Sequence, residues 1–152
     1  MTNPDDWWSQ MEIVVKSPVE LTRLILPSLR ERNTGVVIYT SSRAAVADLP
    51  WTSAYNCAKT SMMCFAGTLQ NELDALKKIE CRNSEENRIS IYSIHPGEIE
   101  TSLHEKAFPE KTKQEAPYII EHMKRIGASR PHFEAGLPAW TCVYLAAGKG
   151  QA

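Results

Sequence analysis

The sequence lacks the features that mark several classes of protein. Its four cysteines form no CxxC pair, and neither they nor its four histidines have the spacing of metal ligands. No run approaches the roughly 18 apolar residues of a membrane-spanning helix. The acidic N-terminus has no apolar stretch of the kind found in secretory signals. We therefore expect a soluble cytoplasmic protein with reduced thiols and no metal.

The charge and the length of the chain further limit the class of protein and its partners. The formal net charge is −1 and the lysines and arginines are scattered, so we expect no general attraction for nucleic acid or for an anionic membrane. A chain of 152 residues is long enough for one hydrophobic core and too short for two ordinary domains. We therefore interpret residues 1–152 as a single domain.

Hydrophobic periodicity predicts a first long helix over residues 4–32. Asn3 can cap it, and proline suits the first helical position that follows. Pro18 and Pro27 are expected to bend or divide this helix, because proline cannot donate a backbone hydrogen bond. Gly35 is expected to end it.

Two short apolar runs read as strands, Val36–Tyr39 and Ile89–Ile94. Neither alternates with polar residues, which is typical of strands that are covered on both faces. A second helix, over residues 53–76, lies between them. The order strand, helix, strand predicts a βαβ unit with two parallel strands. Farther along, we expect one helix over residues 114–127 and a last one over 133–147.

The helix over 53–76 carries a regular stripe that begins with Tyr55 and Lys59, one turn apart. The other members of the stripe are apolar: Met62, Ala66, Leu69, Leu73 and Leu76. An ammonium a few Å from a phenol favours the phenolate. This pair therefore suggests that Tyr55 acts as a general acid and base near neutral pH.

A serine precedes this tyrosine at a suggestive distance. Ser42 lies 13 residues before Tyr55, just after the first predicted strand. The carboxyl edge of a parallel sheet is where α/β folds place their ligands. The Ser42 hydroxyl could therefore hydrogen-bond the same substrate oxygen that Tyr55 protonates.

These residues carry a family resemblance. The run YTSSRAAV…SAYNCAK resembles the active-site region of the short-chain dehydrogenase/reductases, a family of NAD(P)-dependent oxidoreductases with a Rossmann fold. The segment of residues 5–35, the run IHPGEIETSL and the run LPAWTCVYLAAGKG also resemble parts of that family. The resemblance implies a partial Rossmann-like α/β fold of parallel strands flanked by helices.

The resemblance also implies roles for individual residues. Tyr55 would exchange a proton during hydride transfer to or from a carbonyl. Lys59 would favour the phenolate and hydrogen-bond the nicotinamide ribose. Ser42, rather than Ser41, would hold the substrate oxygen. Four more residues would line the nicotinamide pocket: Pro96, Gly97, Ile99 and Thr101.

The sequence departs from the family pattern in two ways. Val14 stands where the family usually has an asparagine that holds a water near the lysine, so we expect a slower proton supply to Tyr55. None of the seven glycines forms the glycine-rich turn that binds the cofactor's pyrophosphate. The family's last strand is also not found. We therefore expect a truncated chain, or one that needs a partner to cover its strand edges. The sequence does not indicate whether the cofactor is NAD or NADP.

Two functions stay open. The first is an oxidoreductase that reduces a ketone or aldehyde, or oxidises a secondary alcohol, through Ser42, Tyr55 and Lys59. The second is an inactive module that forms a homodimer or heterodimer through the helices over 4–32 and 53–76. A hydrolase that uses Ser42 is disfavoured, because no GxSxG elbow surrounds this serine.

Overall fold

A computed structural model of the chain describes residues 3–80, 87–99 and 110–150. The chain divides into two compact units. The first unit comprises Met1–His95 and Cys142–Ala152, and the second comprises Pro96–Thr141. Within the described residues, no helix combines the length and the apolar character needed to cross a membrane.

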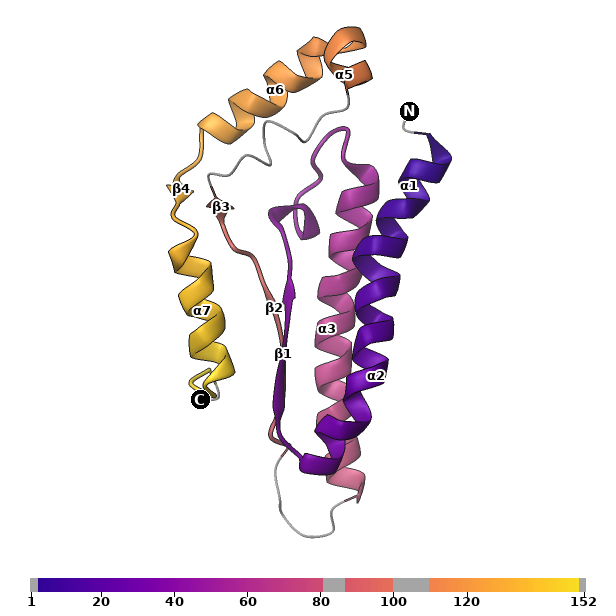
Figure 1. Cartoon of the computed structure of the whole chain (residues 1–152), viewed down its shortest axis with the longest axis vertical. Helices are drawn as coiled ribbons and strands as arrows, with labels where there is room; N and C mark the ends of the chain where they lie inside the picture. Colours follow the sequence, from indigo (N-terminus) through magenta and orange to yellow (C-terminus); the bar gives the residue numbers. More distant parts are fainter. Residues whose placement is uncertain (1–2, 81–86, 100–109, 151–152) are drawn as a thin grey trace. The chain divides into compact units, whose positions relative to one another are not determined.

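The first unit opens with a nearly continuous helical segment (Figure 1). It consists of α1 (Pro4–Met11), a π-helical turn η1 (Glu12–Lys16) and α2 (Ser17–Arg32). The Asn3 side chain accepts a hydrogen bond from the amide of Asp5 at 3.1 Å, which confirms the predicted cap.

The π-helical turn lies next to a proline. The Ser17 amide donates to the carbonyl of Glu12, five residues earlier, and the Ser17 hydroxyl donates to the same oxygen at 2.9 Å. Pro18 has no amide hydrogen, so the regular α-helical bonding cannot pass through it unchanged. The predicted division therefore occurs at this proline. At Pro27, in contrast, α2 continues to Arg32.

The end of α2 differs from the prediction. Asn33, not Gly35, ends the helix, with a left-handed φ of 48° that asparagine tolerates. Gly35 is instead the first residue of the next strand. A Cβ atom there would lie 2.5 Å from Cδ2 of Leu29, so a larger residue at this position would require the Leu29 side chain to move.

The predicted βαβ unit is confirmed. Strand β1 (Gly35–Thr40) and strand β2 (Ile89–Ile94) pair in parallel, with Gly35 opposite Ile89 and Thr40 opposite Ile94. Helix α3 (Ser53–Glu80) connects them and extends four residues beyond the predicted end. A short 3-10 turn, η2 (Arg43–Ala45), follows β1. The α1–α2 segment and α3 lie side by side along the two strands (Figure 1).

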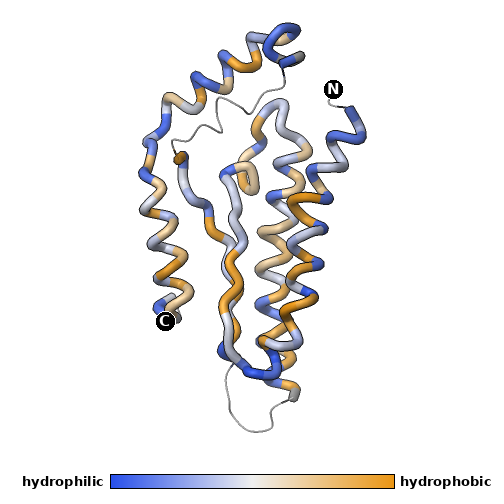
Figure 2. The backbone as a smooth tube through the Cα atoms, viewed as in Figure 1, coloured by the Kyte–Doolittle hydropathy of each residue, from blue (hydrophilic) through white to orange (hydrophobic). Residues whose placement is uncertain are grey.

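The core of the first unit lies between these helices and strands. Its buried members come from α2, β1, α3 and β2: Leu29, Tyr39, Met62, Ala66, Leu69, Leu73, Ile89 and Ile91. Apolar residues are concentrated along both strands (Figure 2). The predicted stripe of α3 is therefore correct in its middle. At its two ends, Tyr55 and Leu76 are 37% and 38% exposed, so they lie outside the core. Residues 36–38 are only half-buried, whereas we expected both faces of the strand to be covered.

One buried polar pair joins α2 to β1. The Thr22 hydroxyl donates to the carbonyl of Pro18 at 2.7 Å and also contacts the hydroxyl of Tyr39. Because a threonine hydroxyl has one proton, Tyr39 must donate to Thr22. The pair fixes the helix against the strand at a buried position.

In its described residues, 96–99 and 110–141, the second unit has helices and a small parallel pairing of strands. Helices α5 (Glu110–Glu115) and α6 (Pro117–Ala128) replace the single helix predicted over 114–127. The break falls at Ala116, because a residue that precedes proline disfavours the helical conformation. Most of α7 (Gly136–Ala146) also belongs to this unit.

The second unit's strands are only two residues long. Strand β3 (Glu98–Ile99) pairs in parallel with β4 (His132–Phe133). This pairing occupies Phe133, so α7 begins at Gly136, three residues after the predicted start. Gly97, next to β3, has a left-handed φ of 91°, and a Cβ atom there would lie 2.8 Å from Cδ2 of Phe133. The left-handed φ favours glycine at this position, and any side chain there would also displace the Phe133 ring.

Candidate active site

The serine segment begins where β1 ends. The amide of Ser41 donates to the carbonyl of Ile94 at 2.7 Å, which extends the pairing of β1 and β2 by one residue. Ser42 then caps η2, and its hydroxyl oxygen accepts a hydrogen bond from the amide of Ala44 at 3.2 Å. Because the oxygen is the acceptor in this contact, the Ser42 hydroxyl keeps its own proton for donation.

Lys59 connects the start of α3 to the end of β1. Its Nζ donates to the carbonyl oxygen of Thr40 at 2.6 Å and lies 5.6 Å from the ring centroid of Tyr55. Burial lowers the pKa of Lys59 below its usual value of 10.5. One side chain therefore contacts the phenol on its own helix and the strand end two residues before Ser42.

Tyr55 lies in the first turn of α3 and is 37% exposed, so solvent or a ligand can reach its side chain. The beginning of this helix is fixed to α1, because the indole Nε1 of Trp7 donates to the hydroxyl of Ser53 at 3.1 Å. The loop before the helix includes Trp51, whose φ of 61° is unusual for a residue with a bulky side chain.

Three polar residues that the sequence analysis did not single out hold this region together. The Asn56 amide contacts the backbone of Leu49 and the side chain of Thr52, whichever way the amide is turned. The Thr60 hydroxyl donates to the carbonyl of Ala45 at 3.0 Å and so joins α3 to η2. Thr52, Asn56 and Thr60 are spaced four residues apart, and Asn56 and Thr60 directly follow Tyr55 and Lys59. This spacing, which is typical of neighbours on a helix, is the sequence signal that could have found them.

Of the four residues expected to line a nicotinamide pocket, the structure describes three. Pro96, Gly97 and Ile99 belong to the second unit, and Thr101 is outside the described residues. The neighbouring Glu98 forms an ion pair with Arg130, and both side chains are largely buried.

Other expected features can now be placed. Val14 is partly buried and packs against the core of the first unit. Cys57, Cys64 and Cys142 have free thiols, and Cys81 is outside the described residues. In the part of the chain that the structure describes, no group of three or more His, Cys, Asp or Glu side chains could hold a metal ion.

Comparison with known proteins decides the family. Residues 1–112 match the sequence profile of the short chain dehydrogenases. The chain belongs to the short-chain dehydrogenase family. A short chain dehydrogenase of Pseudocercospora fijiensis is 30% identical over 141 residues, which cover 93% of this chain and 42% of that protein. The human dehydrogenase/reductase SDR family member 4 is 30% identical over 136 residues, which cover 90% of this chain and 44% of that protein.

Solved structures agree with the family. L-sorbose reductase from Gluconobacter frateurii, determined as a complex with NADPH and L-sorbose, superimposes with a TM-score of 0.69 and 25% identity. The match covers 95% of this chain and 52% of the reductase. This short-chain dehydrogenase chain therefore has a partial Rossmann-like α/β fold, as predicted. It spans about half the length of the relatives it matches.

Proposed function

We propose that the chain provides the carbonyl-binding and proton-transferring part of an NAD(P)-dependent oxidoreductase. The substrate class is a ketone or aldehyde, or the secondary alcohol in the reverse direction. One contact carries the proposal: Lys59 reaches both the Tyr55 ring and the carbonyl of Thr40, two residues before Ser42. An amine, a phenol and a hydroxyl-bearing strand end thus belong to one neighbourhood of the first unit.

The proposed chemistry follows from the three side chains. A bound nicotinamide cofactor would supply or accept the hydride. In reduction, the substrate's carbonyl carbon gains that hydride, and its oxygen gains the phenolic proton of Tyr55, so that an alcohol forms. The Ser42 hydroxyl donates a hydrogen bond to the same oxygen. The Lys59 ammonium stabilises the phenolate that Tyr55 becomes, and donates to a ribose hydroxyl. Oxidation reverses each transfer.

The residues present fit the nicotinamide end of such a cofactor. Tyr55 and Lys59 offer donors suited to carbonyl and ribose oxygens. At Gly97, the backbone is left-handed and carries no side chain, as suits a segment that a flat ring approaches closely. The family resemblance also assigns Pro96, Ile99 and Thr101 to the nicotinamide ring.

No residue of the chain is assigned to the cofactor's pyrophosphate, because none of the seven glycines forms a GxGxxG motif. NADPH is the cofactor in the L-sorbose reductase complex, which supports a nicotinamide cofactor here. NAD and NADP both stay open. Val14 offers no polar group to hold a water near Lys59, so we also propose that proton supply to Tyr55 is slow.

The first experiment is a titration of the chain with NADPH and with NADH, followed by cofactor fluorescence and by the melting temperature. We expect saturable binding that Tyr55→Phe and Lys59→Met weaken. Tyr118→Phe, an exposed tyrosine of the second unit, serves as the matched control. No response up to millimolar cofactor would remove the oxidoreductase proposal.

A second candidate function is assembly without turnover. Large apolar side chains are exposed along both long helices of the first unit, which are the helices expected to pair with a second copy. They include Trp8, Ile13, Leu21, Leu24 and Ile25 on the first segment and Met63 and Ile79 on α3. Exposed apolar patches of this kind mark interaction surfaces.

Sedimentation separates this candidate from the first. We expect a dimer that Leu24→Arg converts to a monomer, since Leu24 is 72% exposed on α2. A chain that stays monomeric at high concentration contradicts the assembly function and leaves cofactor binding untouched.

A further inference from the structure

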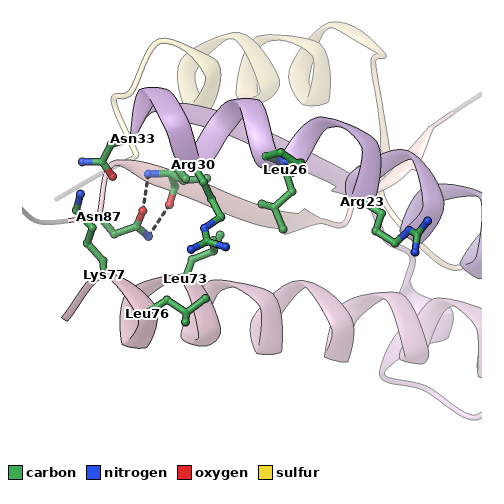
Figure 3. A pocket seen from close by; sticks show the side chains of 10 residues that line it. Arg23, Leu26, Arg30, Asn33, Leu73, Leu76, Lys77 and Asn87 are labelled. Carbon is green, nitrogen blue, oxygen red and sulfur yellow. Dashed lines mark hydrogen bonds between the residues drawn. The ribbon is translucent and has the colours of Figure 1, made fainter. Parts of the chain in front are cut away.

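A groove lies between the second halves of the two long helices. It has a volume of about 380 Å³ and is lined by Arg23, Leu26 and Arg30 of α2 and by Leu73, Leu76 and Lys77 of α3 (Figure 3). This volume falls within the range of small-molecule pockets, about 300–1,000 Å³. Asn33 and Asn87 lie at one end, next to the first residues of β1 and β2. Ser42 follows the opposite end of β1, so this groove is separate from the candidate active site.

The helical segment explains why a groove exists here. The backbones of α1 and η1 pack closely on α3, whereas the backbone of α2 stands farther from it. The lining residues on each helix are three and four positions apart, so they form the two facing ridges. Where the helices separate, these ridges no longer interlock and leave space between them.

The groove combines positive charge with an apolar floor. Arg30 and Lys77 extend from opposite walls near one end, Arg23 lies at the other, and leucines lie between them (Figure 3). None of the described lining side chains is a carboxylate. The nearby carboxylate of Asp74 is turned to the amides of Gln70 and Asn87, from which it accepts hydrogen bonds.

The cations have partners of their own that an anion can join or replace. Arg23 pairs with Glu20 at 3.3 Å, and both side chains are largely exposed, so this ion pair is weak. Arg30 and Lys77 also take part in other interactions within the chain. A ligand anion would add to these contacts through charge-assisted hydrogen bonds, which are shorter and stronger than neutral ones.

We propose that this groove binds a fatty carboxylate. Its head group pairs with Arg30 and Lys77, and its aliphatic chain lies over Leu26, Leu73 and Leu76. The guanidinium of arginine matches a carboxylate with two parallel hydrogen bonds, and the leucines bury the methylene groups. The proposal does not depend on the oxidoreductase function, because it uses none of the same residues.

Calorimetric titration of the whole chain with decanoate, below the concentration at which decanoate forms micelles, tests the proposal. We expect saturable binding of one ligand per chain. Decanol has the chain without the charge, and acetate has the charge without the chain, so each should bind at least about tenfold more weakly.

Variants locate the site. The double variant Arg30→Gln, Lys77→Gln should bind decanoate at least about tenfold more weakly, with an unchanged circular dichroism spectrum. If the double variant does not fold, Lys77→Gln alone is compared with wild type. Lys78→Gln changes the next residue, an exposed lysine outside the groove, and should bind as wild type does.

Several results would overturn the proposal. They are the absence of decanoate binding, equal binding of decanol, and an equal loss in the Lys77→Gln and Lys78→Gln variants. Sedimentation adds one more. If self-association of the chain abolishes decanoate binding, a second copy occupies the groove and the fatty carboxylate is not its ligand.

Discussion

The ammonium nitrogen of Lys59 lies 2.6 Å from the carbonyl oxygen of Thr40. The contact joins the first turns of α3 to the last residue of β1, across 19 residues of sequence. It therefore sets where the amine stands relative to the serines that follow the strand. Any change that moves the end of β1 also moves the amine beside Tyr55.

The half-buried position of Lys59 predicts a pH dependence of stability. Its pKa in the folded chain is lowered below 10.5, so between the two values the unfolded chain binds more protons than the folded chain. Stability should therefore rise with pH through this window and level off as the pH exceeds 10.5. Urea unfolding of wild type and Lys59→Met across that range measures the difference. Lys59→Met should lose this part of the rise, while Lys78→Met should keep it. Equal slopes in all three proteins would contradict the prediction.

Replacement of Tyr55 by phenylalanine tests the proton transfer directly. It removes the hydroxyl and keeps the ring, so kcat/KM for carbonyl reduction should fall by about 10²–10⁴-fold. The control Tyr118→Phe removes a hydroxyl from an exposed tyrosine in α6 and should leave the rate constant unchanged. Turnover that survives in Tyr55→Phe would assign the proton to another group.

The buried pair of Thr22 and Tyr39 predicts a non-additive pair of mutations. Thr22→Val leaves the Tyr39 hydroxyl without its acceptor and should cost about 1–3 kcal/mol of unfolding free energy. Tyr39→Phe leaves Thr22 bonded to Pro18 and should cost about 0.5–1.5 kcal/mol. The double variant should be no less stable than Thr22→Val alone. Chemical denaturation measures all three, and strictly additive losses would contradict the assigned donor.

Two glycines of the second unit should respond to alanine in opposite directions. Gly97→Ala combines a left-handed φ of 91° with a contact of 2.8 Å to Phe133, and should destabilise the pairing of β3 with β4. Gly127→Ala meets no atom within 4 Å and lies in α6, so it should stabilise the helix by up to about 1 kcal/mol. Amide hydrogen exchange of residues in β3 and α6 reports both effects. Equal protection in wild type and Gly97→Ala would contradict the first.

The elements that were predicted well are those whose residues carry a strong local pattern. The run Ile89–Ile94 became a strand with the predicted bounds, and α3 begins at the predicted Ser53. The predictions failed where the decisive factor was not a pattern. Asn33 ends α2 through a left-handed conformation, and the two-residue strand at His132–Phe133 is too short to show a period.

The candidate site, like the fold, was predictable only where a local sequence pattern carried the information. The spacing of Tyr55 and Lys59 on a helix indicated that the two side chains would be neighbours, and the structure has Nζ beside the ring. The partner of Lys59 on β1 is a backbone carbonyl, which every residue possesses, so no residue type could reveal it. The roles of Ser42 and of the residues around Gly97 stay predictions, because they depend on a ligand and not on contacts within the chain.

The π-helical turn at Glu12–Lys16 takes up one residue more than an α-helical turn would hold. Deleting a residue from the turn itself would therefore leave the side chains of α1 close to their present direction. Deleting Gln10, which lies between Trp7 and the turn, would instead rotate Trp7 by about 100° about the helix axis. Trp7 would then point away from Ser53, and the anchor at the start of α3 would be lost. The number of residues between Trp7 and the turn is thus under a geometric constraint that no side chain of the candidate site discloses.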